Sequence, residues 1–137
     1  MNFEGSPKYS FSLGHRLKDI IEIERAIGIL STKWDVDKKT LFQLNIVLEE
    51  LISDTMYYGF SDRDQGSINV DLTYEKDAIY VQIMDDAMAF DPSRAMDSVG
   101  YQMGNRALPL TQQIGEEPTY VNADGKNIFS FKIKING

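Results

Sequence analysis

The feature that most constrains this chain is one apolar stripe in its first half. Apolar residues and a threonine return there at three- and four-residue steps: Leu41, Leu44, Leu48, Leu51, Ile52 and Thr55. This spacing predicts an amphipathic helix that runs to Tyr58 and stops at Gly59, with Asp35 or Asp37 as its N-cap. A helix with one apolar face needs a second layer to cover that face.

The flanking segments predict that this second layer is a sheet. Five segments have the pattern of half-buried strands: Tyr9–Leu13, Ser67–Tyr74, Ala78–Met84, Thr119–Asn122 and Ile128–Ile135. A further helix is expected from about His15 to Lys33, and a short one over Ala107–Ile114. We therefore expect an α+β fold, a two-layer sandwich with the helices on one face of a mixed or antiparallel sheet.

Composition limits the classes of function. The 137 residues, 42% of them hydrophobic and 26% charged, predict a single globular domain over 1–137. The net charge of −7 argues against nucleic acid and anionic membranes as partners. No cysteine and a single histidine exclude disulfides, thiolate sites and histidine-based zinc sites. With no basic leader and no long apolar run, the cytoplasm is the expected location.

Two groups of acids are candidates for chemistry. Glu50 and Asp54 are four residues apart, so they project from one helix face, where one carboxylate could act as a base and the other hold Mg²⁺. Asp85 ends a strand and could accept a hydrogen bond from a base amine. On spacing alone two simpler interpretations stay open: a solvated acidic face that includes Glu49, and a strand end whose loop is anchored by Phe90.

Two motifs carry a resemblance to a known family. Glu49-Glu-Leu-Ile-Ser-Asp-Thr-Met-Tyr-Tyr-Gly-Phe60 resembles the N-box of the GHKL ATP-binding superfamily. Asp85-Asp-Ala-Met-Ala-Phe-Asp-Pro92 is similar to the Asp-x-Gly motif and nearby Phe-Asp-Pro of its anti-sigma factor serine-protein kinases. Gly104-Asn-Arg-Ala-Leu-Pro-Leu110 takes the place of the glycine-rich lid. The resemblance covers nearly the whole chain, in order.

This resemblance implies a Bergerat-type, histidine-kinase-like ATPase fold that binds ATP and Mg²⁺ beneath a lid around 86–106. It implies Glu50 as the catalytic base, Asp54 at the metal position and Asp85 as the residue that reads adenine. The other nucleotide-binding positions by resemblance are Ala87, Phe90, Gly104, Asn105, Arg106 and Ala107. Family members bind a sigma factor and phosphorylate a serine of a STAS-type antagonist, and a homodimer is a family expectation.

Several motif positions depart from the family pattern. Asp54 replaces an asparagine, Ala87 replaces a glycine, and Asn105 and Ala107 stand where lid glycines are expected. A methyl at position 87 costs energy if the backbone must be left-handed, or obstructs the base if only close approach is needed. Three functions therefore remain: an ATP-dependent serine/threonine-protein kinase that regulates by partner switching, a non-catalytic binding module of the same fold, and an unrelated α+β protein.

Overall fold

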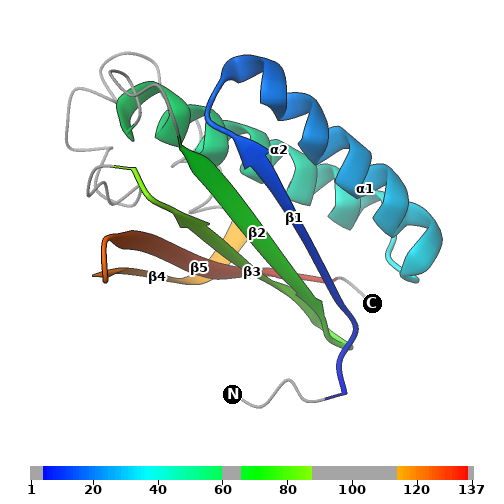
Figure 1. The fold of residues 1–137 in the computed structure, drawn as a ribbon. Helices are drawn as coiled ribbons and strands as arrows, with labels where there is room; N and C mark the ends of the chain where they lie inside the picture. Colours follow the sequence, from blue (N-terminus) through cyan, green and yellow to red (C-terminus); the bar gives the residue numbers. More distant parts are fainter. Residues whose placement is uncertain (1–4, 60–65, 88–113, 136–137) are drawn as a thin grey trace.

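The computed structural model describes residues 5–59, 66–87 and 114–135. The helices are α1 (Ile21–Lys33) and α2 (Lys38–Asp54), and the strands are β1 (Lys8–Gly14), β2 (Ser67–Tyr74), β3 (Ala78–Asp85), β4 (Gly115–Ala123) and β5 (Lys126–Lys134). All strand pairs are antiparallel, in the order β1-β2-β3-β5-β4. Both helices lie on one face of this sheet (Figure 1). The predicted α+β sandwich is confirmed, and the sheet is antiparallel.

The two helices begin where local capping allows. The Asp37 carboxylate accepts hydrogen bonds from the Thr40 backbone nitrogen at 3.2 Å and from the Thr40 hydroxyl at 2.6 Å, so Asp37 and not Asp35 is the N-cap of α2. The Thr40 hydroxyl holds the pKa of Asp37 below its usual value. The first helix starts later than its apolar spacing predicts, because Leu17–Ile20 forms a 3₁₀ turn before α1.

The apolar stripe of α2 forms the centre of the core, as predicted. Leu44, Leu48 and Ile52 are 0% exposed, and they belong to one cluster with apolar side chains of the sheet. After Asp54 the helical path continues as a π turn over Thr55–Gly59. None of the helices within the described ranges combines the length and the apolar composition that crossing a membrane requires.

All five predicted strands are present, and their ends differ from the prediction by at most two residues except at the start of the fourth strand. The fourth strand begins at Gly115 and not at Thr119, because the ladder with β5 shifts register between Glu116 and Thr119. Glu117 there has a positive φ of 55°, which breaks the alternating pattern that marks a strand in sequence. The predicted short helix lies outside the described residues, apart from its last residue, Ile114.

Alternate residues of β3 and β5 face the helices. On β3 the inward series ends at Asp85, and on β5 it begins at Asn127. These two residues are direct partners in the register of the two strands. The sheet therefore brings one acid and one amide together on its helix-covered face.

Candidate functional site

The candidate site lies at the end of β3, between the sheet and the last turn of α2. Seven residues line a small cavity there: Leu51, Thr55, Ile83, Asp85, Tyr120, Asn127 and Phe129. Its volume of about 10 Å³ is the space of one water molecule. Leu51 comes from α2 and Thr55 from the π turn that follows it, and β3, β4 and β5 contribute the other five residues.

Among the described residues of this lining, Asp85 is the only charged one, and it is only 6% exposed. Its Oδ1 accepts hydrogen bonds from the Asn127 side-chain nitrogen at 2.8 Å and from the Ala87 backbone nitrogen at 3.0 Å. Among the described residues, no donor reaches its Oδ2. Burial raises the pKa of Asp85 above its ordinary value, the hydrogen bonds from Asn127 and Ala87 oppose this shift, and Asp86 adds to it.

Asn127 is a site residue to which the sequence motifs assign no role, although its distance from Leu110, like that of Tyr120, suits the closing segment of the family that the motifs resemble. It is 3% exposed, and its Oδ1 accepts hydrogen bonds from the Tyr120 hydroxyl at 2.5 Å and the Asn122 side-chain nitrogen at 2.9 Å. The available signal was its position: Asn127 precedes Phe129 and Phe131 in a series of alternate apolar residues. A polar residue in such a series is buried and needs hydrogen-bond partners.

The acids of α2 lie beside this cavity, each one residue before a lining residue. Glu50 precedes Leu51 and Asp54 precedes Thr55, and both acids are half-buried. Within the described residues, nothing donates a hydrogen bond to the buried Oε2 of Glu50. The simple interpretation of a fully solvated acidic face therefore does not describe Glu50.

Glu49 faces a different neighbour. Its pKa is raised, first by burial and then by repulsion from Glu24 of α1 and from Glu50. The charge of Glu24 on α1 thus acts on Glu49 in addition to that of Glu50. This difference makes Glu49 a natural control for experiments on Glu50.

Ala87 occupies the position where the motif has glycine, and it is 6% exposed. Among the described residues other than glycine, only Glu117 and Asp124 have positive φ, so Ala87 is not left-handed. The backbone-strain argument for glycine therefore does not apply to this conformation. Ala87 instead belongs to the buried core cluster. The remaining cost of its methyl group would be steric, because the methyl would obstruct the approach of a base.

The described residues fit a nucleotide at its base end. One oxygen of Asp85 accepts no hydrogen bond from the described residues, so it has the chemistry to pair with an amino group such as that of adenine, although the cavity must widen to hold a purine. No group of three His, Cys, Asp or Glu side chains that could hold a metal ion occurs in the described ranges. Mg²⁺ bound near Asp54 would take most of its ligands from phosphates and water, as it commonly does. Phe90, Gly104, Asn105, Arg106 and Ala107 lie outside the described residues.

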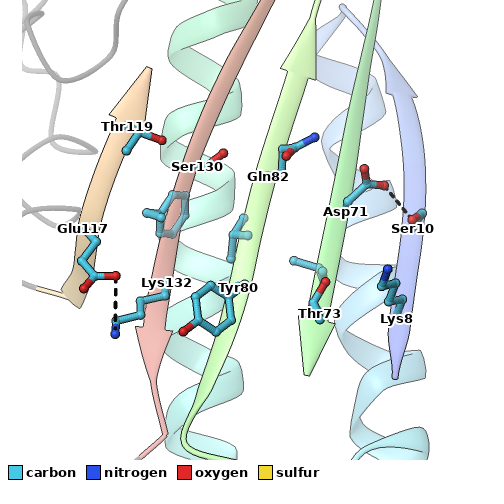
Figure 2. A pocket seen from close by; sticks show the side chains of 13 residues that line it. Lys8, Ser10, Asp71, Thr73, Tyr80, Gln82, Glu117, Thr119, Ser130 and Lys132 are labelled. Atoms are coloured by element: carbon cyan, nitrogen blue, oxygen red, sulfur yellow. Dashed lines mark hydrogen bonds and ion pairs between the residues drawn. The ribbon is translucent and has the colours of Figure 1, made fainter. Parts of the chain in front are cut away.

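A larger cavity, of about 700 Å³, lies on the other face of the sheet. The side chains labelled in Figure 2 lie on the side of the sheet away from both helices. Ser10 donates a hydrogen bond to Asp71 at 2.6 Å, and Lys132 pairs with Glu117 at 3.6 Å (Figure 2). A polar outer face of this kind is common in antiparallel sheets, and none of the motif residues lines it.

Comparison with known proteins identifies the family of the chain. The family model described as the histidine kinase-like ATPase domain matches residues 15–133. That range includes Glu50, Asp54, Asp85 and Asn127. No curated protein matches the chain. Because the matched range covers most of the sequence, the chain belongs to the histidine kinase-like ATPase domain family.

Proposed function

We propose that this chain binds ATP and transfers its γ-phosphate to a serine or threonine of a protein partner. The observation that carries the proposal is the Asp85 carboxylate, which is buried at a strand end and has one oxygen without a donor among the described residues. Because Asp85 is only 6% exposed, its charge is largely desolvated, and a hydrogen-bond donor on a ligand would stabilise it. The amino group of adenine is such a donor, and the family match supports ATP as the ligand.

Glu50 is the proposed general base. Its Oε2 is buried and receives no hydrogen bond from the described residues, so it is available to accept a proton. It takes the proton of the serine hydroxyl while that oxygen bonds to the γ-phosphorus and the bond to the ADP oxygen breaks. Asp54 supplies an oxygen ligand for Mg²⁺, which neutralises charge on the phosphates when bound.

The proposed partners follow from the resemblance of the motifs to the anti-sigma factor serine-protein kinases. They are a sigma factor, a STAS-type antagonist that carries the phosphorylated serine, or both. A second copy of the chain, forming a homodimer, is a further proposed partner. Regulation by partner switching in the cytoplasm is the role that fits such partners.

Titration calorimetry of the folded chain with ATP and ADP, with and without Mg²⁺, tests the first step. We expect micromolar binding that depends on Mg²⁺.

Glu50→Gln should keep this affinity within about 3-fold and reduce transfer of labelled γ-phosphate to a STAS-type protein by about 100-fold or more. Glu49→Gln is the matched control, with unchanged transfer. Absence of binding at millimolar nucleotide contradicts the proposal, and full transfer by Glu50→Gln removes Glu50 from the base role.

Ala87 favours a second candidate, a non-catalytic protein-binding module of the same fold. Its buried methyl lies beside Asp85, next to a cavity of only about 10 Å³. Ala87→Gly distinguishes the two functions. If the wild-type chain fails to bind ADP and Ala87→Gly binds it, the site has lost nucleotide through this methyl and the second candidate is preferred.

A further inference from the structure

We propose that β1 pairs with β1 of a second copy of this chain, so that the two sheets join into one sheet across a two-fold axis at Phe11. A homodimer is part of the proposed function, where it follows from the resemblance of the motifs. The free edge of β1 supplies the surface that forms it, and this surface does not depend on nucleotide binding.

β1 lies at one edge of the sheet and pairs only with β2 (Figure 1). The Tyr74 backbone nitrogen donates to the Pro7 carbonyl oxygen at 2.9 Å, so Pro7 and every second residue after it face β2 in the ladder. The residues between them direct their backbone groups to the free edge: Lys8, Ser10, Ser12 and Gly14. Among the described residues, no backbone partner outside the ladder reaches these groups.

The opposite edge of the sheet, β4, is protected against such pairing. Its ladder shifts register between Glu116 and Thr119, and Glu117 there has a φ of 55°. Pro118 in the same segment has no backbone N–H to donate. Bulges, prolines and charged side chains commonly protect edge strands, and β1 has none of them over Tyr9–Gly14. The contrast between the two edges indicates that β1 is the edge that takes a partner.

The residue pattern of β1 favours a second β1 as that partner, because it is symmetric about Phe11. On each side of Phe11 stand a serine and then an apolar residue, Tyr9 or Leu13. Antiparallel pairing centred at Phe11 therefore places apolar beside apolar and serine beside serine. The four residues with free backbone groups are also symmetric about Phe11, so free donors meet free acceptors. Tyr9 and Phe11 are only partly buried in one copy, and the pairing covers them further.

Charge also favours a second copy. In the register centred at Phe11, Lys8 lies opposite Gly14 of the other copy. A β-carbon added at Gly14 would lie 2.5 Å from Oδ2 of Asp19, so the Asp19 carboxylate stands close to the side-chain position of Gly14. Lys8 has no ion pair among the described residues, and this register brings it beside the Asp19 carboxylate of the second copy. The two-fold axis makes this contact twice.

Sedimentation of the full chain from about 1 to 500 μM measures the association, and we expect a reversible equilibrium of monomer and dimer. Ser12→Pro removes an outward N–H and leaves the ladder with β2 intact, so it should weaken the dimer by about 10-fold or more. Ser12→Ala keeps the N–H and is the matched control, with a dissociation constant within about 3-fold of the wild type.

Lys8→Glu tests the charge contact and also serves if Ser12→Pro fails to fold. It replaces attraction by repulsion at both ends of the paired strands, so it should weaken the dimer by about 10-fold or more. Lys39→Glu makes the same change of charge on α2 and should stay within about 3-fold of the wild type.

Hydrogen exchange of single backbone amides identifies the surface. The amides of Ser10 and Ser12 should exchange rapidly in dilute protein and about 10-fold or more slowly in the dimer, whereas Phe11, in the ladder with β2, should be slow in both. A dimer that keeps these two amides fast, or that tolerates both Ser12→Pro and Lys8→Glu, overturns the inference and leaves the homodimer. A chain that stays monomeric overturns both, while calorimetry decides nucleotide binding separately.

Discussion

At the scale of single residues, the buried charge of Asp85 lowers stability at neutral pH, while the same carboxylate serves the proposed ligand binding. Burial is the largest cause of its raised pKa. An acid with a raised native pKa binds its proton more tightly in the folded than in the unfolded chain. Its contribution to stability is therefore greatest at low pH and is lost as the pH rises from about the ordinary pKa of 3.8 through the native pKa. The charge at neutral pH is a cost that a bound ligand can offset.

Asp85→Asn should therefore be more stable than the wild type at pH 7, and this advantage should shrink as the pH falls through the raised native pKa of Asp85 to the ordinary value of 3.8. The same variant should bind ADP about 10-fold or more weakly, because an amide nitrogen replaces an acceptor oxygen. Denaturant unfolding at both pH values and calorimetry measure the two effects. Asp71→Asn, on the exposed face of β2, is the control. Lower stability of Asp85→Asn at pH 7 would contradict this account.

At the scale of elements, the β4–β5 hairpin carries most of the network around Asp85. Tyr120 and Asn122 come from β4, and Asn127 comes from β5. The two strands join through Asp124 and Gly125, whose φ values are 54° and 75°. A two-residue turn with both φ values positive matches the twist of the strands it connects. The register of this turn places Asn122 opposite Asn127.

Gly125→Ala should lower the free energy of unfolding by about 1–2 kcal/mol, the usual cost of a left-handed backbone for a residue with a β-carbon. No heavy atom lies within 4 Å of the added carbon, so the cost is conformational and not a clash. Asp124→Asn, which tolerates the same conformation, should change stability by less than about 0.5 kcal/mol. Denaturant titration measures both, and equal stabilities would argue against a strained turn.

At the scale of the whole molecule, net charge and ligand binding are coupled. The chain carries a net charge of −7, so a polyphosphate approaches against repulsion unless Mg²⁺ accompanies it. A ligand that binds only the folded state adds about 2.7 kcal/mol of stability at 100 times its dissociation constant. Binding should therefore be visible as a rise in melting temperature.

We expect Mg-ADP to raise the melting temperature increasingly with the logarithm of its concentration, and ADP without Mg²⁺ to raise it less. Scanning fluorimetry measures the shift. Asp85→Asn is the matched control, since its shift should be smaller at every concentration. An equal shift from Mg²⁺ alone would mean that the ion stabilises the protein without nucleotide.

Part of the candidate site could be predicted from sequence and part could not. Glu50, Asp54 and Asp85 belong to short motifs, so their residue types and spacing are visible in the chain itself. Asn127 is 42 residues from Asp85, and only the pairing of β3 with β5 makes them neighbours. Whether Ala87 needs a left-handed backbone was also open, because φ is not determined by the residue type alone.

By itself, the sequence determined the layers of this protein, because the apolar period of α2 and the alternation of the strands are local patterns that dictate which faces are buried. It also determined the N-cap position to within two residues. Only the tertiary structure decided the early start of β4 and the network around Asp85. Each of these depends on which strand pairs with which and in what register, and hydrogen bonds between distant segments settle that pairing.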